Sequence, residues 1–145
     1  MTFTAGRTLL ATPPNGSDLQ AEIQRLVVEN DIDFCRFEAI GSLERASMTY
    51  YDQTAQVDRV IEVEQPVMLV HLIGTALKSA KAVEVHGHLV LGDALGMASG
   101  GDLSPGCVVF SCELIVQELV GPALERTTDP VTGLSHLNMV ARGEE

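Results

Sequence analysis

The sequence predicts one α+β domain, in which a single N-terminal helix packs on a mainly antiparallel sheet of six to seven strands. A helical pattern of apolar residues occurs once, before residue 30. The residues after it fall into short runs that alternate between apolar and polar side chains. Because no second long helical pattern follows, repeated βαβ crossovers are not expected. The chain of 145 residues is long enough for one domain with its own hydrophobic core.

The helix is predicted over residues 18–29. Its apolar stripe recurs at helical spacing and consists of Leu19, Ile23, Leu26 and Val27. Ser17 and Gln20 have the spacing of a capping box, which satisfies the first unpaired amides of a helix. The preceding Pro-Pro-Asn-Gly sequence is typical of a turn.

The strands are expected to follow one another after the helix. In order, they are residues 33–40, 43–51, 57–64, 66–77, 82–91, a short strand near Met97, and 107–119. Gly41 is expected to end the first of them. Residues 66–77 form a nearly continuous apolar run, which is typical of a central strand covered on both faces. The short apolar piece at 134–140 is expected to dock on the core.

Charge and hydropathy limit the possible partners and the compartment. The formal net charge is −11, and the nine Lys and Arg residues are scattered singly. Because proteins grip duplex nucleic acid mainly through Lys and Arg at its phosphates, we expect no direct nucleic-acid binding. No apolar stretch reaches the ~20 residues of a membrane span, and no signal-peptide pattern occurs. The sequence therefore predicts a cytoplasmic protein with no membrane partner.

The three cysteines are odd in number and lie in apolar segments. They are Cys35, Cys107 and Cys112. This pattern favours reduced thiols packed in the core over a disulfide framework.

The most informative segment is VHGHLVLGDALGMASGGDL, residues 85–103. His86 and His88 are two residues apart in a predicted strand, so their side chains leave the same face, separated by two rises of ~3.3 Å. A tight turn at the following glycine pair would carry Asp102 to the same place. Two imidazoles and a carboxylate with an open fourth position are a legitimate ligand set for zinc. The segment predicts a divalent metal site, with zinc as the expected metal.

Each of these residues also has a structural interpretation. The two histidines can be solvent-facing or hydrogen-bonded, and Asp102 can be a turn residue that tolerates loop conformations. His71 is expected to be a buried, hydrogen-bonded core residue, with membership of the metal site as the alternative. Glu113 is expected to pair with Arg36 or Arg45, or else to lie near the metal cleft, because an unpaired buried carboxylate is unfavourable.

Five blocks of sequence stand in a characteristic order. They are GSDLQAEIQRLVVEN (16–30), EAIGSLERASMTYYD (38–52), PVMLVHLIGTAL (66–77), HGHLVLGDALGMASGGDLSPGCVVFSCELIV (86–116) and RTTDPVTGLSHL (126–137). Together they resemble the plant and prokaryote conserved (PPC) domain family in its bacterial single-domain form. The resemblance implies one PPC-like domain over residues 1–145, with a core at about residues 16–137.

The resemblance also carries expectations about assembly and metal binding. It implies a homotrimer and a metal site built on the H-x-H strand and on a histidine that follows a glycine pair. His86 and His88 match this pattern, whereas Asp102 stands in place of the third histidine and makes the ligand set harder and more anionic. The family is often labelled DNA-binding, but no AT-hook-like R-G-R-P sequence occurs here.

Three functions are compatible with these observations. The favoured one is a non-catalytic, homotrimeric metal-binding module with a regulatory or small-ligand-binding role. The first alternative is a DNA-binding or DNA-associated regulator, which the acidic charge opposes. The second is a metal-dependent hydrolase, with Glu113 or Asp93 as general base. An oligomer is expected independently, because one helix covers only one face of an apolar sheet.

Overall fold

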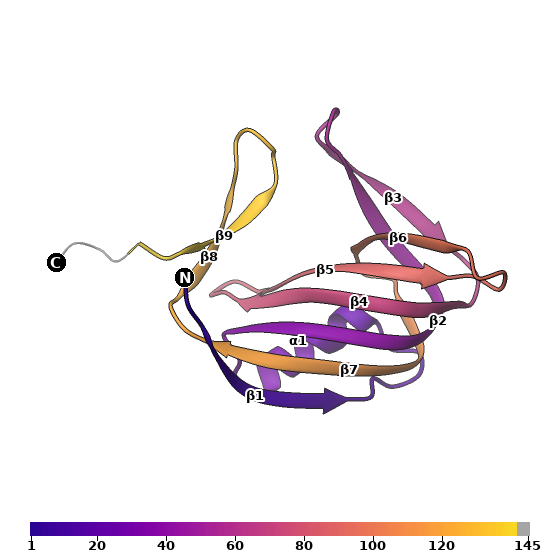
Figure 1. The fold of residues 1–145 in the computed structure, drawn as a ribbon, viewed down its shortest axis with the longest axis horizontal. Coiled ribbons are helices and arrows are strands. Elements are labelled where there is room, and N and C mark those ends of the chain that lie inside the picture. Colours follow the sequence, from indigo (N-terminus) through magenta and orange to yellow (C-terminus); the bar gives the residue numbers. More distant parts are fainter. Residues whose placement is uncertain (142–145) are drawn as a thin grey trace.

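The computed structural model describes residues 1–141 and confirms the α+β fold, with one helix and an antiparallel sheet (Figure 1). The elements are β1 (Thr4–Ala11), α1 (Leu19–Glu29), β2 (Phe34–Asp52), β3 (Val57–Val63), β4 (Val67–Lys78), β5 (Val83–Gly92), β6 (Ala98–Leu103), β7 (Val108–Val120), β8 (Leu124–Thr128) and β9 (Ser135–Met139). The main sheet has seven strands in the order β1-β7-β2-β4-β5-β6, with β3 paired to β2. Strands β8 and β9 form a separate two-stranded sheet. In residues 1–141, no helix has the length and apolar character needed to span a membrane.

Helix α1 has the predicted apolar stripe, whose four residues are buried. The predicted capping box was wrong, because the N-cap is Asp18 rather than Ser17. The Asp18 carboxylate accepts hydrogen bonds from the amides of Ala21, at 2.9 Å, and Gly106, at 2.7 Å. The Ser17 hydroxyl instead donates to a carbonyl of the preceding turn. Asp18 therefore joins the start of the helix to the loop before β7.

Strand β2 is one strand of 19 residues, so the prediction that Gly41 ends a strand was wrong. Its first half pairs with β4 and β7, and its second half, from Ala46, pairs with β3 and β6. Gly41 lies at a register shift with φ +151°, and a Cβ there would lie 2.2 Å from the Ser111 carbonyl oxygen. Glycine at this position allows β7 to approach closely while β2 continues.

Strand β6 closes a ring of four strands. It pairs with β5, through His88 and Asp102 among others, and with the second half of β2, where Thr49 also pairs with Asp102. Because β2 pairs with β4 and β4 pairs with β5, the circuit β2-β4-β5-β6 returns to β2. The closure occurs at the strand position that carries Asp102.

The two faces of the sheet differ in their covering. Helix α1 lies behind the sheet in the view of Figure 1 and packs against the buried side chains of the core. We call the opposite side the outer face. It exposes the apolar side chains Leu10, Ile40, Met68, Val70, Ile73, Val90, Phe110 and Ile115. The expectation that residues 66–77 are covered on both faces is therefore not met in the single chain, where Met68 is 60% exposed.

Two segments differ from the sequence prediction. Strand β1, at one edge of the sheet, was not predicted, because most of its residues are exposed and show no clear alternation. Residues 134–140 were expected to dock on the core, but this segment contains β9, which pairs with β8 outside the main sheet. The Tyr51 hydroxyl donates to the Thr132 carbonyl oxygen at 2.6 Å and links the turn of this hairpin to the end of β2.

The three cysteines are buried and unpaired, as predicted. Burial raises the pKa of each thiol above its ordinary value, and the pKa of Cys35 reaches about 11. These thiols are packing residues with little thiolate character near neutral pH.

Candidate metal centre

Strand β5 places both predicted imidazoles on the outer face. His88 pairs directly with Ile73 of β4, and His86 pairs with Thr75. Directly opposite residues of an antiparallel pair lie on the same face, and alternate residues share it. The side chains of His86 and His88 are 58% and 68% exposed. Both rings are therefore accessible to an ion from solution.

Asp102 comes from strand β6 rather than from the tight turn expected at Gly100–Gly101. A Cβ at Gly101 would lie 2.8 Å from the Thr49 carbonyl oxygen, and one at Gly100 would lie 2.9 Å from the Leu89 carbonyl oxygen. The glycines are needed because β6 is held closely between β5 and β2, which is a close backbone approach that sequence alone does not show. The turn lies earlier, at Asp93–Gly96.

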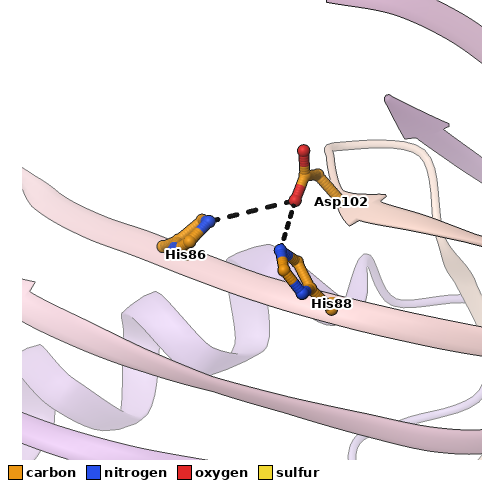
Figure 2. Close-up of side chains that lie close together, drawn as sticks. All are labelled: His86, His88 and Asp102. Carbon is orange, nitrogen blue, oxygen red and sulfur yellow. Dashed lines mark ion pairs between the residues drawn. The ribbon is translucent and has the colours of Figure 1, made fainter. Parts of the chain in front are cut away.

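The three side chains converge on the outer face (Figure 2). One Asp102 oxygen, Oδ1, lies 2.8 Å from His88 Nε2 and 3.9 Å from His86 Nε2. The imidazole centroids are 5.3 Å apart, and the rings are nearly perpendicular, at 85°. One ligand atom from each residue lies within 4.8 Å of the others, and this is the one such group of three among residues 1–141.

The electrostatic environment favours the neutral form of one ligand. Partial burial lowers the pKa of His86 below its ordinary value, and the nearby charge of Arg126 lowers it further. Asp102 acts in the opposite direction, and His88 adds to the lowering. A neutral imidazole has a free lone pair, which is the form that binds metal.

The donor set fits a zinc-like ion. Zinc binds imidazole nitrogen and carboxylate oxygen at about 2.0–2.2 Å, so neighbouring ligands of a tetrahedral ion are roughly 3.4 Å apart. The two distances from Asp102 Oδ1, at 2.8 and 3.9 Å, lie on either side of that separation. The side chains of His86 and His88 are more than half exposed, which leaves room for the rotations that would equalise these distances.

The other residues predicted for the site lie elsewhere. His71 is half-exposed rather than buried in the core, and its Nε2 lies 3.8 Å from a Glu38 oxygen instead of joining the group. Its strand bulges between Leu69 and His71, which turns the imidazole outward although its neighbours are apolar.

Neither carboxylate proposed as a general base reaches the site. Glu113 is exposed on β7 and makes no ion pair within residues 1–141, so the expected pairing with Arg36 or Arg45 was wrong; Arg36 pairs with Glu38 instead. The Asp93 carboxylate accepts hydrogen bonds from amides of its own turn. The hydrolase alternative therefore receives no support from these two residues.

Sequence reasoning missed Arg126 of β8. Its Nη2 lies 3.4 Å from the Thr75 hydroxyl, beside His86, and its Nε lies 3.5 Å from a Glu84 oxygen. Arg126 is 40 residues from His86 along the chain, and only the fold of the β8–β9 hairpin over the end of the sheet brings the two together.

A known protein family matches most of this chain. The model of the Plants and Prokaryotes Conserved domain, abbreviated PCC or PPC, matches residues 2–120. The chain belongs to this family. The matched residues include β1, which the sequence analysis did not predict, and they end before β8.

Two solved PPC-fold structures are similar over nearly the whole chain. The metal-containing protein from Archaeoglobus fulgidus is 32% identical, with a TM-score of 0.87, and the match covers 93% of this chain and 95% of that one. The plant- and prokaryote-conserved protein from Pyrococcus horikoshii is 29% identical, also with a TM-score of 0.87, and the match covers 97% of both chains.

Curated relatives are much longer than this PPC domain. Two sequences from Synechococcus strains, each called bifunctional protein GlmU, are 29% identical over 126 and 127 residues. The match covers 86% of this chain but 19% of each relative, so the chain spans about a fifth of their length. The likeness is therefore confined to one segment of those longer proteins.

Proposed function

We propose that this PPC domain is a non-catalytic metal-binding module in which His86, His88 and Asp102 hold one divalent ion, with zinc the preferred metal. The observation that carries the proposal is the convergence of three ligand atoms within 4.8 Å on an accessible face. The similar protein from Archaeoglobus fulgidus is described as metal-containing, which supports the same assignment. The cytoplasm is the compartment we propose, and it suits three unpaired cysteines.

The residues present determine what the site does. Two imidazoles and one carboxylate leave a fourth position of a tetrahedral ion open, and a bound zinc ion supplies a positive charge there for a small ligand. The exposure of both imidazoles keeps this position accessible. Because neither Glu113 nor Asp93, the two carboxylates considered as general bases, reaches the three ligands, we assign the site to binding rather than to turnover.

Metal analysis of protein purified without a histidine tag tests the proposal. We expect about one zinc ion per chain after zinc addition and dialysis, and a loss of at least about 100-fold in affinity for His88→Ala. This estimate exceeds the ~10–100-fold loss that follows removal of an outer partner of a metal site. Titration calorimetry measures both the stoichiometry and the affinity.

His71→Ala is the matched control. It removes an exposed histidine from the same face, yet His71 lies beside Glu38 and outside the ligand group. We expect its zinc affinity to equal that of the wild type. Clearly substoichiometric zinc in the wild type, or equal losses in the two variants, would contradict the proposal.

We also propose that the module is a homotrimer whose subunits pack through the apolar part of the outer face around Met68 and Phe110, away from His86 and His88. Contiguous exposed apolar surface on a monomer marks an interaction site, and eight large apolar side chains are exposed here. Sedimentation should give three copies of the chain. Met68→Glu should shift the protein to monomers, whereas Val28→Glu, on the exposed side of α1, should not. A stable wild-type monomer would exclude the trimer.

A further inference from the structure

Arg126 is almost withdrawn from solvent but has few partners. Its side chain is 12% exposed. The two polar contacts that its side chain makes within residues 1–141 are both long: Nε lies 3.5 Å from Glu84 Oε2, and Nη2 lies 3.4 Å from Thr75 Oγ1. Glu84 Oε2 is itself buried without a hydrogen-bond partner in residues 1–141. The contact between the Arg126 guanidinium and the Glu84 carboxylate therefore does not satisfy the hydrogen-bonding capacity of either group.

A guanidinium has five N–H donors, and a buried charge with unmet donors is unfavourable. The two long contacts of Arg126 leave most of these donors available. A planar guanidinium is suited to bidentate binding of carboxylate or phosphate oxygens. Arg126 therefore has the planar donor geometry of an anion-binding residue and has N–H donors available for an anion.

The position of Arg126 connects it to the metal centre. Thr75, its contact on β4, is the direct cross-strand partner of His86. A hollow of about 310 Å³ opens on the outer face beside these residues and is lined, among others, by Thr75, His86 and His88. The hollow gives a small ligand access to both imidazoles, and Arg126 lies next to it through its contact with Thr75.

The charges of the site favour binding of an anion only when the metal ion is bound. With a divalent ion, neutral imidazoles, Arg126 and the carboxylates of Asp102 and Glu84, the net charge of the site is about +1. Without the ion the same groups carry a net negative charge. A monovalent oxyanion would therefore bring the occupied site to neutrality.

We propose that Arg126 and the metal centre together bind a small oxyanion, through a carboxylate or phosphate group. His86, His88 and Asp102 would hold the ion, which would supply the positive charge for one end of the anion, and the guanidinium would donate hydrogen bonds to the anion's oxygens. This inference rests on the proposed metal centre. Arg126 lies outside residues 2–120, the segment that the family model matches.

Calorimetric titration of tag-free protein loaded with zinc tests the inference. Acetate and inorganic phosphate are the two probes, at constant ionic strength. We expect Arg126→Gln to retain one zinc ion per chain but to bind the anions about tenfold more weakly or worse, the range for loss of a charge-assisted hydrogen bond. Arg126→Lys keeps the charge without the planar fork and should show an intermediate loss. The tighter-binding probe identifies the chemical class.

Arg25→Gln is the control, because it changes the net charge equally but lies on α1, where Arg25 pairs with Glu22 and Glu29. Its anion affinity should equal that of the wild type. Circular dichroism establishes that each variant is folded. Equal anion affinity in Arg126→Gln and wild type, or equal affinity in the metal-free protein, would overturn the inference while zinc binding stands. Failure of the wild type to bind zinc would overturn the metal centre and this inference together.

Discussion

The two ends of the main sheet use a carboxylate and a basic side chain in different ways. At the β1–β7 end, Glu118 accepts hydrogen bonds from Arg7 Nε at 2.9 Å, Nη2 at 3.0 Å and the Arg7 amide at 3.1 Å. At the β5–β6 end, one oxygen of Asp102 lies 2.8 Å from His88 and 3.9 Å from His86. Arg7 satisfies the hydrogen-bonding capacity of the Glu118 carboxylate, whereas the histidines leave that of Asp102 partly unused.

This difference separates a structural ion pair from the proposed set of metal ligands. A guanidinium is always charged and satisfies a carboxylate bidentately, so it leaves no lone pair for a metal. Imidazoles become neutral near physiological pH and then have a free lone pair. The presence of an acidic and a basic residue on neighbouring strands is therefore not sufficient for a metal site. Whether the basic residue is an arginine or a histidine decides whether a metal can bind.

The largest expected effect comes from replacing the two carboxylates by amides of the same size. Asp102→Asn should weaken zinc binding by more than about 100-fold, because it removes an anionic ligand rather than an outer partner. Glu118→Gln should leave zinc affinity unchanged. Calorimetry on both variants measures the difference. A similar loss in the two variants would mean that the ends of the sheet do not differ as described.

The next effect concerns the strand that carries Asp102. Gly101→Ala places a Cβ 2.8 Å from the Thr49 carbonyl oxygen and 3.1 Å from Met48 Cβ. We expect a loss of about 1–3 kcal/mol in the free energy of unfolding, as for overpacking, together with weaker zinc binding. Ser99→Ala, at an exposed position of the same strand, is the control. Unchanged denaturant midpoints for Gly101→Ala would contradict the close approach of β6.

A smaller effect should appear at the other end as a dependence on pH. Hydrogen bonds from Arg7 lower the pKa of Glu118 to about 2, from its ordinary value of 4.5. The stabilisation by this ion pair is therefore complete above pH 4.5 and is lost as the pH falls toward 2. Glu118→Gln should be less stable than the wild type at pH 6, and the difference should shrink below pH 4.5. The Arg7 side chain is 52% exposed to solvent, so the effect is modest. A stability difference independent of pH would contradict this prediction.

The smallest change should come from Asp102→His, which restores the three histidines of the family pattern. An imidazole is a softer ligand than a carboxylate, so zinc should still bind, whereas the affinity for manganese relative to zinc should fall. Competition titrations with the two metals measure the ratio. A ratio equal to that of the wild type would show that Asp102 does not contribute to metal preference.

The sequence was sufficient for features that depend on local periodicity. The stripe from Leu19 to Val27 identified α1, because burial of one helix face repeats along the chain. The spacing of His86 and His88 predicted two imidazoles on one face, because alternation in a strand is a local rule. Asp102 lies beside the two histidines, as predicted, although the turn assigned to it was wrong.

Features that depend on distant pairing were not accessible in the same way. The glycines before Asp102 indicated a turn, and nothing local shows that two strands crowd them. His71 was expected to be buried because its neighbours are apolar, but a bulge directs it outward. Arg126 approaches His86 only through the fold of the C-terminal hairpin. In each case the deciding contact lies far away in the sequence.

The long strand β2 has a consequence for cooperativity. Its residues pair with β3, β4, β6 and β7, so its two halves cannot unravel independently without exposing backbone groups of several neighbours. Amide protons of β2 should accordingly be among the slowest to exchange with deuterium, and their rates should report global opening. Because β2 is continuous, an ion bound where β6 meets β2 would stabilise the folded state of the whole domain. Removal of that ion by a chelator should therefore lower the melting temperature.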